Sequence, residues 1–94
     1  MGKVFVGQTK LTIKLDTGSL LVNVDVAKIK YKKGDNTIGE FVAAVNGRHL
    51  EYVVLNASDL DVSGLWDFYA HILYDDAKII IGEKESLKIY TPGE

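Results

Sequence analysis

Two predicted turns divide residues 26–54 into three alternating segments, and this arrangement constrains the fold more than any other feature of the sequence. Asn46-Gly47 lies between two apolar runs, and this dipeptide is typical of a two-residue type I′ hairpin turn. Residues 33–37 separate the first segment from the second and contain the turn-forming sequence Gly-Asp-Asn. We therefore expect three consecutive antiparallel strands that share one register.

The two turns also predict which side chains share a face. The first turn pairs Lys30 with Glu40, and the second pairs Val45 with Arg48. The face predicted to point inward then carries Ile29, Tyr31, Phe41, Ala43, Leu50, Tyr52 and Val54. The opposite face carries Lys28, Lys30, Glu40, Val42, Glu51 and Val53. A slip of one residue at either turn would destroy this separation.

The rest of the chain also consists mainly of short segments typical of β-strands. Residues 11–15 alternate cleanly, and residues 65–74 place Trp66, Phe68, Ala70, Ile72 and Tyr74 on one face. Residues 56–64 are the one plausible helical turn, and Gly82 suggests a bulge. Short strands with turns every 8 to 12 residues predict an all-β, immunoglobulin-like antiparallel β-sandwich of about seven to eight strands. We expect residues 1–94 to form a single domain, with a small closed barrel as the alternative architecture.

Composition excludes several classes of protein. The 94 residues contain no cysteine, so disulfides, thiolate catalysis and cysteine-based zinc sites are ruled out. The net charge of −2 gives no general attraction to nucleic acid. No apolar run approaches the roughly 20 residues that span a bilayer, and the first residues show no signal-peptide pattern. We expect synthesis in the cytoplasm without a signal peptide, and neither a nucleic-acid nor a membrane partner.

The segment Asp61-Val62-Ser63-Gly64-Leu65-Trp66-Asp67-Phe68 resembles the corner that precedes the penultimate strand of immunoglobulin-like domains. The usual pattern there is Asp-x-Gly-x-Tyr-x-Cys. Trp66 stands at the tyrosine position and Phe68 at the cysteine position. The resemblance implies a similar corner that lacks the disulfide and the phenol hydrogen bond.

Two further segments, Leu15-Asp16-Thr17-Gly18 and residues 28–41, extend the resemblance. The pattern is similar to small immunoglobulin-like modules of bacteriophage tails and baseplates, such as the N-terminal domain of phage baseplate upper proteins. Gly34-Asp35-Asn36 replaces the Lys-x-Pro-Asp-Gly sequence that such modules often carry near this hairpin. The resemblance implies assembly into a virion, in a structural or attachment role.

Two groups of side chains are candidate binding surfaces. An apolar set on the outward face needs a cover, either from a neighbouring subunit or from the loop before Leu65, and consists of Val42, Ala44, Val53 and Leu55. We expect a partner protein there, either a second copy of the chain or another virion protein. Tyr69 and Tyr90 are the aromatic side chains available to face a ligand such as a carbohydrate.

No constellation of residues indicates catalysis. His49 and His71 are the only histidines, and their spacing does not enforce a metal site. No serine has a glycine-framed elbow, and no glycine loop is suited to cradle a phosphate. Lysines 28, 30, 32 and 33 favour a solvated strand face, neutralised in part by Glu40 and Glu51. The prediction is a non-enzymatic structural or interaction module of a phage or prophage particle, without cofactor or metal. The alternative is a carbohydrate-binding module or a general protein-partner adaptor.

Overall fold

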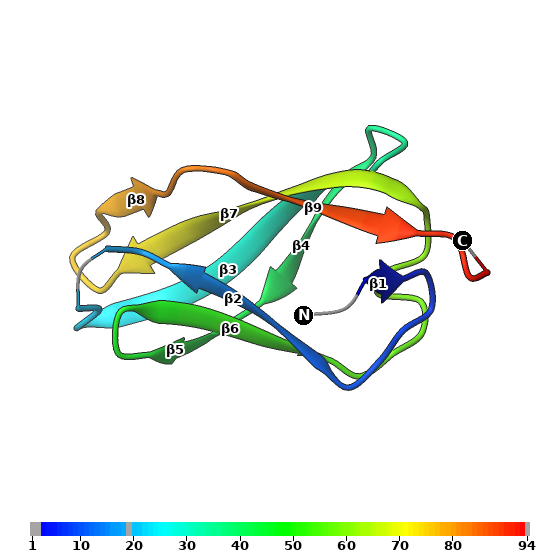
Figure 1. The fold of residues 1–94 in the computed structure, drawn as a ribbon. Helices are drawn as coiled ribbons and strands as arrows, with labels where there is room; N and C mark the ends of the chain where they lie inside the picture. The colour runs from blue at the N-terminus through cyan, green and yellow to red at the C-terminus, as the bar shows by residue number, and fades with distance from the viewer. Residues whose placement is uncertain (1–2, 19, 94) are drawn as a thin grey trace.

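The computed structural model describes residues 3–18 and 20–93, which form nine strands and no helix, arranged as two facing sheets (Figure 1). The strands are β1 (Val4–Phe5), β2 (Leu11–Asp16), β3 (Val24–Lys32), β4 (Ile38–Val42), β5 (Ala44–Asn46), β6 (His49–Val54), β7 (Gly64–Tyr74), β8 (Ile79–Ile81) and β9 (Glu85–Tyr90). The predicted all-β, immunoglobulin-like sandwich is confirmed. Among the described residues no helix is long and apolar enough to cross a membrane.

The larger sheet has the strand order β1-β9-β7-β3-β4, and β8 pairs with β7 beyond the end of β9. The smaller sheet has the order β2-β6-β5. All neighbours are antiparallel except β1 and β9, which run parallel. The strand count exceeds the prediction because residue 43 separates β4 from β5 and residues 82–84 separate β8 from β9.

The first predicted hairpin has the expected register, since Lys30 pairs with Glu40 and Ile29 with Phe41. The three segments do not form one sheet, however. β4 pairs with β3 in the larger sheet, whereas β5 pairs with β6 in the smaller sheet. The chain changes sheet at Ala43, whose N–H still donates to the Ala27 carbonyl of β3 at 3.0 Å.

The second predicted register is wrong by two residues. Val45 pairs with Leu50 rather than with Arg48, so Gly47 and Arg48 form the loop and Asn46 pairs with His49. Gly47 has a φ of 63°, the left-handed value that the turn requires. Because strand side chains repeat every two residues, the slip preserves the predicted faces.

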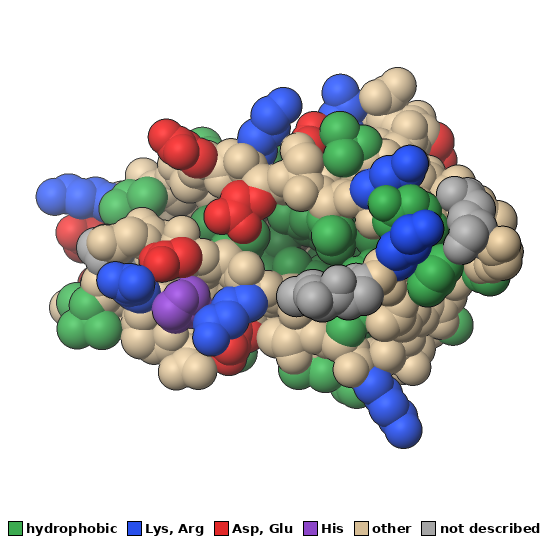
Figure 2. Space-filling model, viewed as in Figure 1, with side chains coloured by type: hydrophobic (Ala, Val, Ile, Leu, Met, Phe, Trp, Pro, Cys, Tyr) green, Lys and Arg blue, Asp and Glu red, His purple; other side chains and the backbone are tan. Residues whose placement is uncertain are grey.

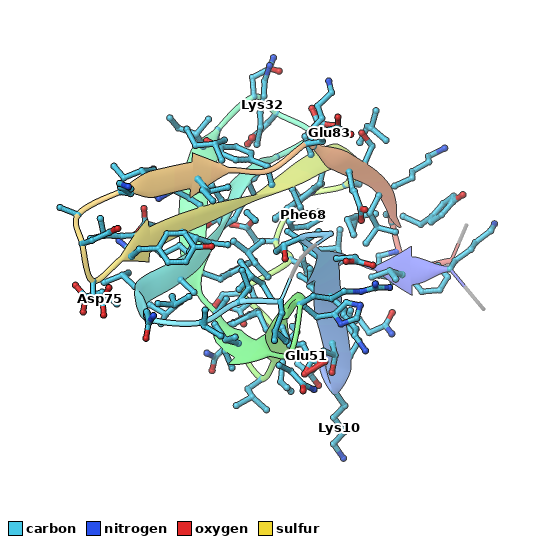
Figure 3. All side chains as sticks on the ribbon, turned by 90° about the vertical axis from the view of Figure 1, so that its left-hand side faces the viewer. Lys10, Lys32, Glu51, Phe68, Asp75 and Glu83 are labelled. Carbon is cyan, nitrogen blue, oxygen red and sulfur yellow. The ribbon has the colours of Figure 1, made fainter. Side chains whose placement is uncertain are left out.

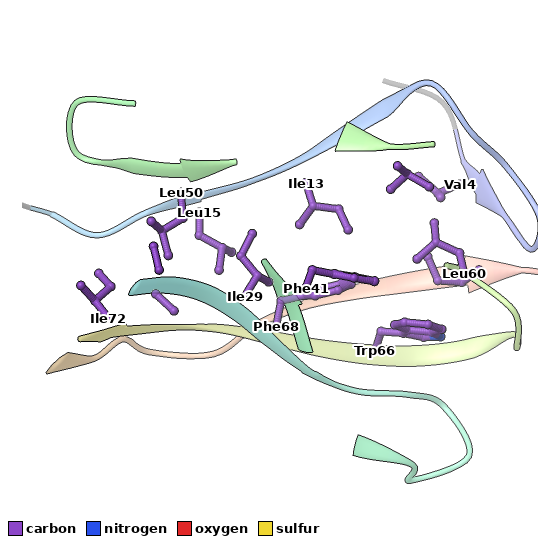
Figure 4. Close-up of a cluster of buried hydrophobic side chains, with 14 of the residues drawn as sticks. Val4, Ile13, Leu15, Ile29, Phe41, Leu50, Leu60, Trp66, Phe68 and Ile72 are labelled. Atoms are coloured by element: carbon purple, nitrogen blue, oxygen red, sulfur yellow. The ribbon is translucent and has the colours of Figure 1, made fainter. Parts of the chain in front are cut away.

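The core lies between the two sheets (Figure 4). Phe41 and Tyr52, predicted to be cross-strand neighbours, instead belong to different sheets and stack across the sandwich with centroids 4.2 Å apart. The fully buried large side chains come from both sheets and from the loop after β6: Trp66, Ile29, Leu50, Leu60, Ile72, Ile89 and Val54. The predicted helical turn over residues 56–64 is reduced to a hydrogen-bonded turn at residues 57–60, where the Asp59 N–H donates to the Asn56 carbonyl at 3.0 Å. Gly64 does not close it and instead begins β7.

The corner before β7 carries a hydrogen bond that the sequence comparison did not predict. The indole Nε1–H of Trp66 donates to the Val62 carbonyl at 3.0 Å. In immunoglobulin-like domains a tyrosine hydroxyl at this corner bonds to the backbone a few residues upstream. Trp66 supplies the equivalent bond with its indole nitrogen, and its side chain is completely buried.

Candidate functional site

One long side of the sandwich is open, between β2 of the smaller sheet and the β8–β9 edge of the larger sheet. Two adjoining hollows occupy this side, with volumes of about 460 and 290 Å³. Their floor is apolar and includes Ile13, Leu15, Phe68 and Ala70, all of them core residues. Figure 2 shows this apolar surface at the bottom of a hollow with charged side chains on both rims.

Charged side chains of both signs form the rims of this groove. Glu83 and Glu85 belong to the β8–β9 side, and Figure 3 shows Glu83 outside the sheets while Phe68 points between them. Asp16 belongs to the β2 side. The Gly18 N–H, which donates to Asp16 Oδ1 at 2.8 Å, is the main reason that the pKa of this carboxyl lies below its usual value. The Asp16 carboxylate is therefore ionised at neutral pH, and the Arg48 guanidinium pairs with it at 3.2 Å.

The most exposed apolar segment beside this groove is β8. Its three consecutive isoleucines, Ile79, Ile80 and Ile81, have exposed fractions of 56%, 51% and 64%. Ile80 pairs with Ile72, which is 1% exposed, so both side chains point to the inner face of the sheet. Ile80 nevertheless stays half exposed at the sheet edge, where it lines the groove.

The main chain of β8 has one edge free. On the side facing β7, the Lys78 carbonyl accepts from Tyr74 N–H and the Gly82 N–H donates to the Ala70 carbonyl, each at 2.9 Å. Bonding in an antiparallel pair alternates along the strand, so the N–H and C=O groups of the first and third isoleucines point away from β7. Within residues 3–18 and 20–93, β7 is the only strand that pairs with β8.

The edge strand β2, across the groove, differs from β8 in the side chains that accompany its outward-facing main-chain groups. The Thr17 N–H donates to the Arg48 carbonyl of the turn before β6. By the same alternation, the outward-facing main-chain groups of β2 belong to Thr12, Lys14 and Asp16. Charged side chains are a common protection of sheet edges against unwanted pairing. β2 has this protection, and the three isoleucines of β8 do not.

The structure separates the four outward apolar residues predicted as an interface. Val42 lies on β4 of the larger sheet, while Ala44 and Val53 lie on strands of the smaller sheet and Leu55 follows β6. All four are exposed, and Val42 and Leu55 reach 75% and 71%. Because the chain changes sheet at residue 43, they do not form the single face that was predicted. A protein contact at any of them stays a prediction.

The two candidate ligand-facing aromatics lie apart on the larger sheet. Tyr69 is on β7 opposite Lys30, whereas Tyr90 is the last residue of β9. The Tyr90 ring already has the Nζ atoms of Lys3 and Lys88 over it, 4.6 and 4.8 Å from the centroid. Neither tyrosine lines the groove described above. Their role as ligand contacts stays a prediction.

The titratable residues form ion pairs rather than a reactive cluster. Glu40 partly neutralises the lysine row as predicted, through an ion pair with Lys28, but Glu51 lies in the smaller sheet and pairs with Lys14 at 3.8 Å. His49 approaches Asp16 at 3.7 Å. In the described part of the chain, no group of three or more histidine, aspartate or glutamate side chains is placed to hold a metal ion.

Sequence reasoning did not identify β8 as a candidate site. A short uninterrupted apolar run is typical of a strand that is buried on both faces. Here the same run forms an edge strand with both faces exposed. The run Ile79-Ile80-Ile81 therefore gave no signal that separates a buried strand from this exposed edge strand.

The fold and the open edge define the chain as an immunoglobulin-like β-sandwich with an exposed apolar edge strand. No family model and no curated protein matches the sequence. Among solved structures, the chain is similar to CopC from Methylosinus trichosporium OB3b, with a TM-score of 0.60 and 17% sequence identity. The alignment covers 100% of this chain and 89% of CopC. At this identity the similarity shows the fold alone.

This comparison overturns the resemblance to phage baseplate modules and the virion function that it implied. The structural similarity is to CopC from Methylosinus trichosporium OB3b and not to a phage baseplate module. The physical reason for the error is that the motifs behind it, residues 15–18, 28–41 and 61–68, are turn and core sequences. Such sequences specify a β-sandwich, and many unrelated functions use that fold.

Proposed function

We propose that this protein is a non-enzymatic binding module that accepts an extended polypeptide segment as an additional strand beside β8. The observation that supports the proposal is the exposure of three consecutive isoleucines on a strand whose outer main-chain groups face no other described strand. In recognition by strand addition, main-chain hydrogen bonds supply affinity, and alternate side chains supply specificity.

The groove suits this mode of binding. A strand added beside β8 alternates its side chains between the two faces of the larger sheet. One set lies over the inner face, next to Ile80 and the apolar floor around Leu15 and Ala70. The other set lies on the outer face beside Ile79 and Ile81. Apolar residues at alternate positions of the partner are therefore favoured.

An array of synthetic octapeptides with apolar residues at alternate positions tests this function. The uniformly ¹⁵N-labelled protein is titrated with each peptide, and amide exchange is followed residue by residue. Strand addition predicts slower exchange of the Ile79 and Ile81 amide protons, because those groups gain hydrogen bonds. Failure of every peptide to protect these two amides overturns the proposed function.

Proline substitution supplies the matched control. Ile81→Pro removes an outward N–H that makes no bond to β7, so the domain is expected to stay folded while peptide binding is lost. Thr12→Pro removes the equivalent outward N–H from β2, on the opposite side of the groove, and is expected to leave peptide binding intact. Equal effects of the two variants would contradict a site at β8.

A further inference from the structure

We infer that the segment accepted by β8 carries a lysine or arginine, and that this basic side chain occupies the larger hollow of the groove, beside Gly82. The inference rests on the proposed function and specifies the chemistry of its partner. Three features of the structure support it. They are the bare inner face of the sheet at Gly82, the apolar floor of the hollow and the excess of carboxylates at its rim.

Gly82 leaves the inner face of the larger sheet bare at the end of β8. Its N–H donates to the Ala70 carbonyl at 2.9 Å, so bonding to β7 continues one residue past the strand. A Cβ on Gly82 would lie 3.3 Å from the Ala70 Cβ, so this position faces the same side of the sheet as the buried Ala70. A residue of the added strand opposite Gly82 points to that face as well. Because glycine has no side chain, the space there is open to it.

The hollow that this side chain enters has an apolar floor and carboxylates at its rim. Its volume is about 460 Å³, and Leu15 and Ala70 contribute to the floor. Glu85 pairs with Phe68, whose side chain points between the sheets (Figure 3). Paired residues share a face, so the Glu85 side chain also belongs to the inner face, on the side of the hollow. Glu83 lines the same hollow.

The rim has more negative than positive charge. Among the described residues that line the hollow, Lys84 is the only basic one, and its Nζ lies 3.8 Å from a carboxylate oxygen of Asp67. Glu83 and Glu85 make no ion pair with any residue in 3–18 or 20–93. One lysine therefore serves three carboxylates, and the rim keeps an excess of negative charge whichever of them the lysine approaches.

A lysine or arginine side chain matches both parts of the hollow. Its aliphatic stem covers the apolar floor while its charged head reaches the carboxylates of the rim. A neutral side chain would leave these carboxylates unpaired, and an acidic one would be repelled. Ile80 precedes Gly82 by two residues and faces the same side of the sheet. The partner is therefore expected to carry an apolar residue over Ile80 and a basic residue two positions away.

Octapeptides of alternating valine and threonine with blocked termini test the inference. One valine is replaced either by arginine or by citrulline, which is the neutral isostere of arginine, and each valine position is tested in turn. Binding to the ¹⁵N-labelled full chain is measured from the Ile79 and Ile81 amides. In the best position, the arginine peptide is expected to bind about two- to fivefold more tightly than its citrulline counterpart, as for an exposed ion pair. Raising the ionic strength from about 0.01 M to about 1 M is expected to remove this preference.

Two double variants locate the charge that is recognised. Glu83→Gln combined with Glu85→Gln neutralises the rim, and it is expected to abolish the preference for arginine while the citrulline peptide binds as before. Asp75→Asn combined with Asp76→Asn is the matched control, because it removes the same charge from the turn between β7 and β8, outside the hollow. The control is expected to keep the preference. Urea unfolding of each variant confirms that the domain is folded.

The possible results separate this inference from the proposed function. Equal binding of arginine and citrulline peptides at every position, with the Ile79 and Ile81 amides protected by both, overturns the inference and leaves the proposed function standing. A preference for arginine that the control lowers as much as the rim variant also overturns the inference, because it would reflect net charge alone. Peptides that protect neither amide overturn the proposed function, and the inference with it.

Discussion

Replacement of Trp66 by alanine is expected to remove a large share of the stability of the domain. The side chain is fully buried, and its ring lies 5.4 Å from that of Tyr31 and 5.9 Å from that of Phe68. Truncating a buried tryptophan to alanine typically costs about 3–5 kcal/mol. Domains of this size have a total free energy of unfolding of about 5–15 kcal/mol. The variant is therefore expected to be marginally folded or molten.

Urea unfolding followed by far-UV circular dichroism measures the loss without using tryptophan fluorescence. For a urea dependence of about 1.5 kcal/mol per molar, a loss of 3–5 kcal/mol lowers the unfolding midpoint by about 2–3 M. A midpoint within about 0.3 M of wild type, equivalent to the small effect of a surface substitution, would show that Trp66 does not pack in the core.

A second variant separates the ring from its hydrogen bond. Trp66→Phe keeps an aromatic ring between the same neighbours but removes the Nε1–H that donates to the Val62 carbonyl. Loss of one partner of a buried hydrogen bond costs about 1–3 kcal/mol. We expect the phenylalanine variant to be folded and to lose less stability than the alanine variant. Equal losses in the two variants would refute the view that ring packing dominates at this corner.

Three other substitutions test the turns and the loop contacts. Gly47→Val is expected to lower the free energy of unfolding in urea by about 1–2 kcal/mol, because a β-branched residue is strained at the left-handed φ of this turn. A Cβ there meets no atom within 4 Å, so Gly47→Asn, which tolerates this φ better, is expected to cost less. Gly34→Ala is expected to destabilise by about 1–3 kcal/mol, because its Cβ would overlap the Ser63 carbonyl oxygen; an unchanged midpoint would refute this close approach. The Tyr52 hydroxyl donates to Asp59 at 2.7 Å, and this bond is the main reason that the pKa of Tyr52 rises from 10.0 to about 12. The stabilisation is complete below pH 10 and is lost as the pH rises through 12, so the stability difference between wild type and Tyr52→Phe should shrink over that range; a constant difference contradicts the bond.

The candidate site shows the limit of sequence reasoning. A run of three isoleucines predicts a strand, but the same run is expected at the centre of a sheet and at its edge. Whether β8 lies at the centre or at the edge depends on which residues of β7 pair with β8 and which pair with β9. Residues 82–84 end the pairing of β8 with β7 and lead into the pairing of β9 with β7, so the two short strands follow one another along the same edge of β7. No local pattern in residues 79–81 encodes that outcome.

The sequence by itself determined most of the strand segments, the inward and outward faces and the register of β3 with β4. Each depends on side-chain alternation or turn chemistry within a few residues. Only the tertiary structure decided that the chain changes sheets at residue 43, so that Phe41 and Tyr52 meet across the core rather than along one sheet. The same holds for the free edge of β8. Pairing between strands distant in sequence depends on how the whole core is filled, and local patterns are compatible with more than one such arrangement.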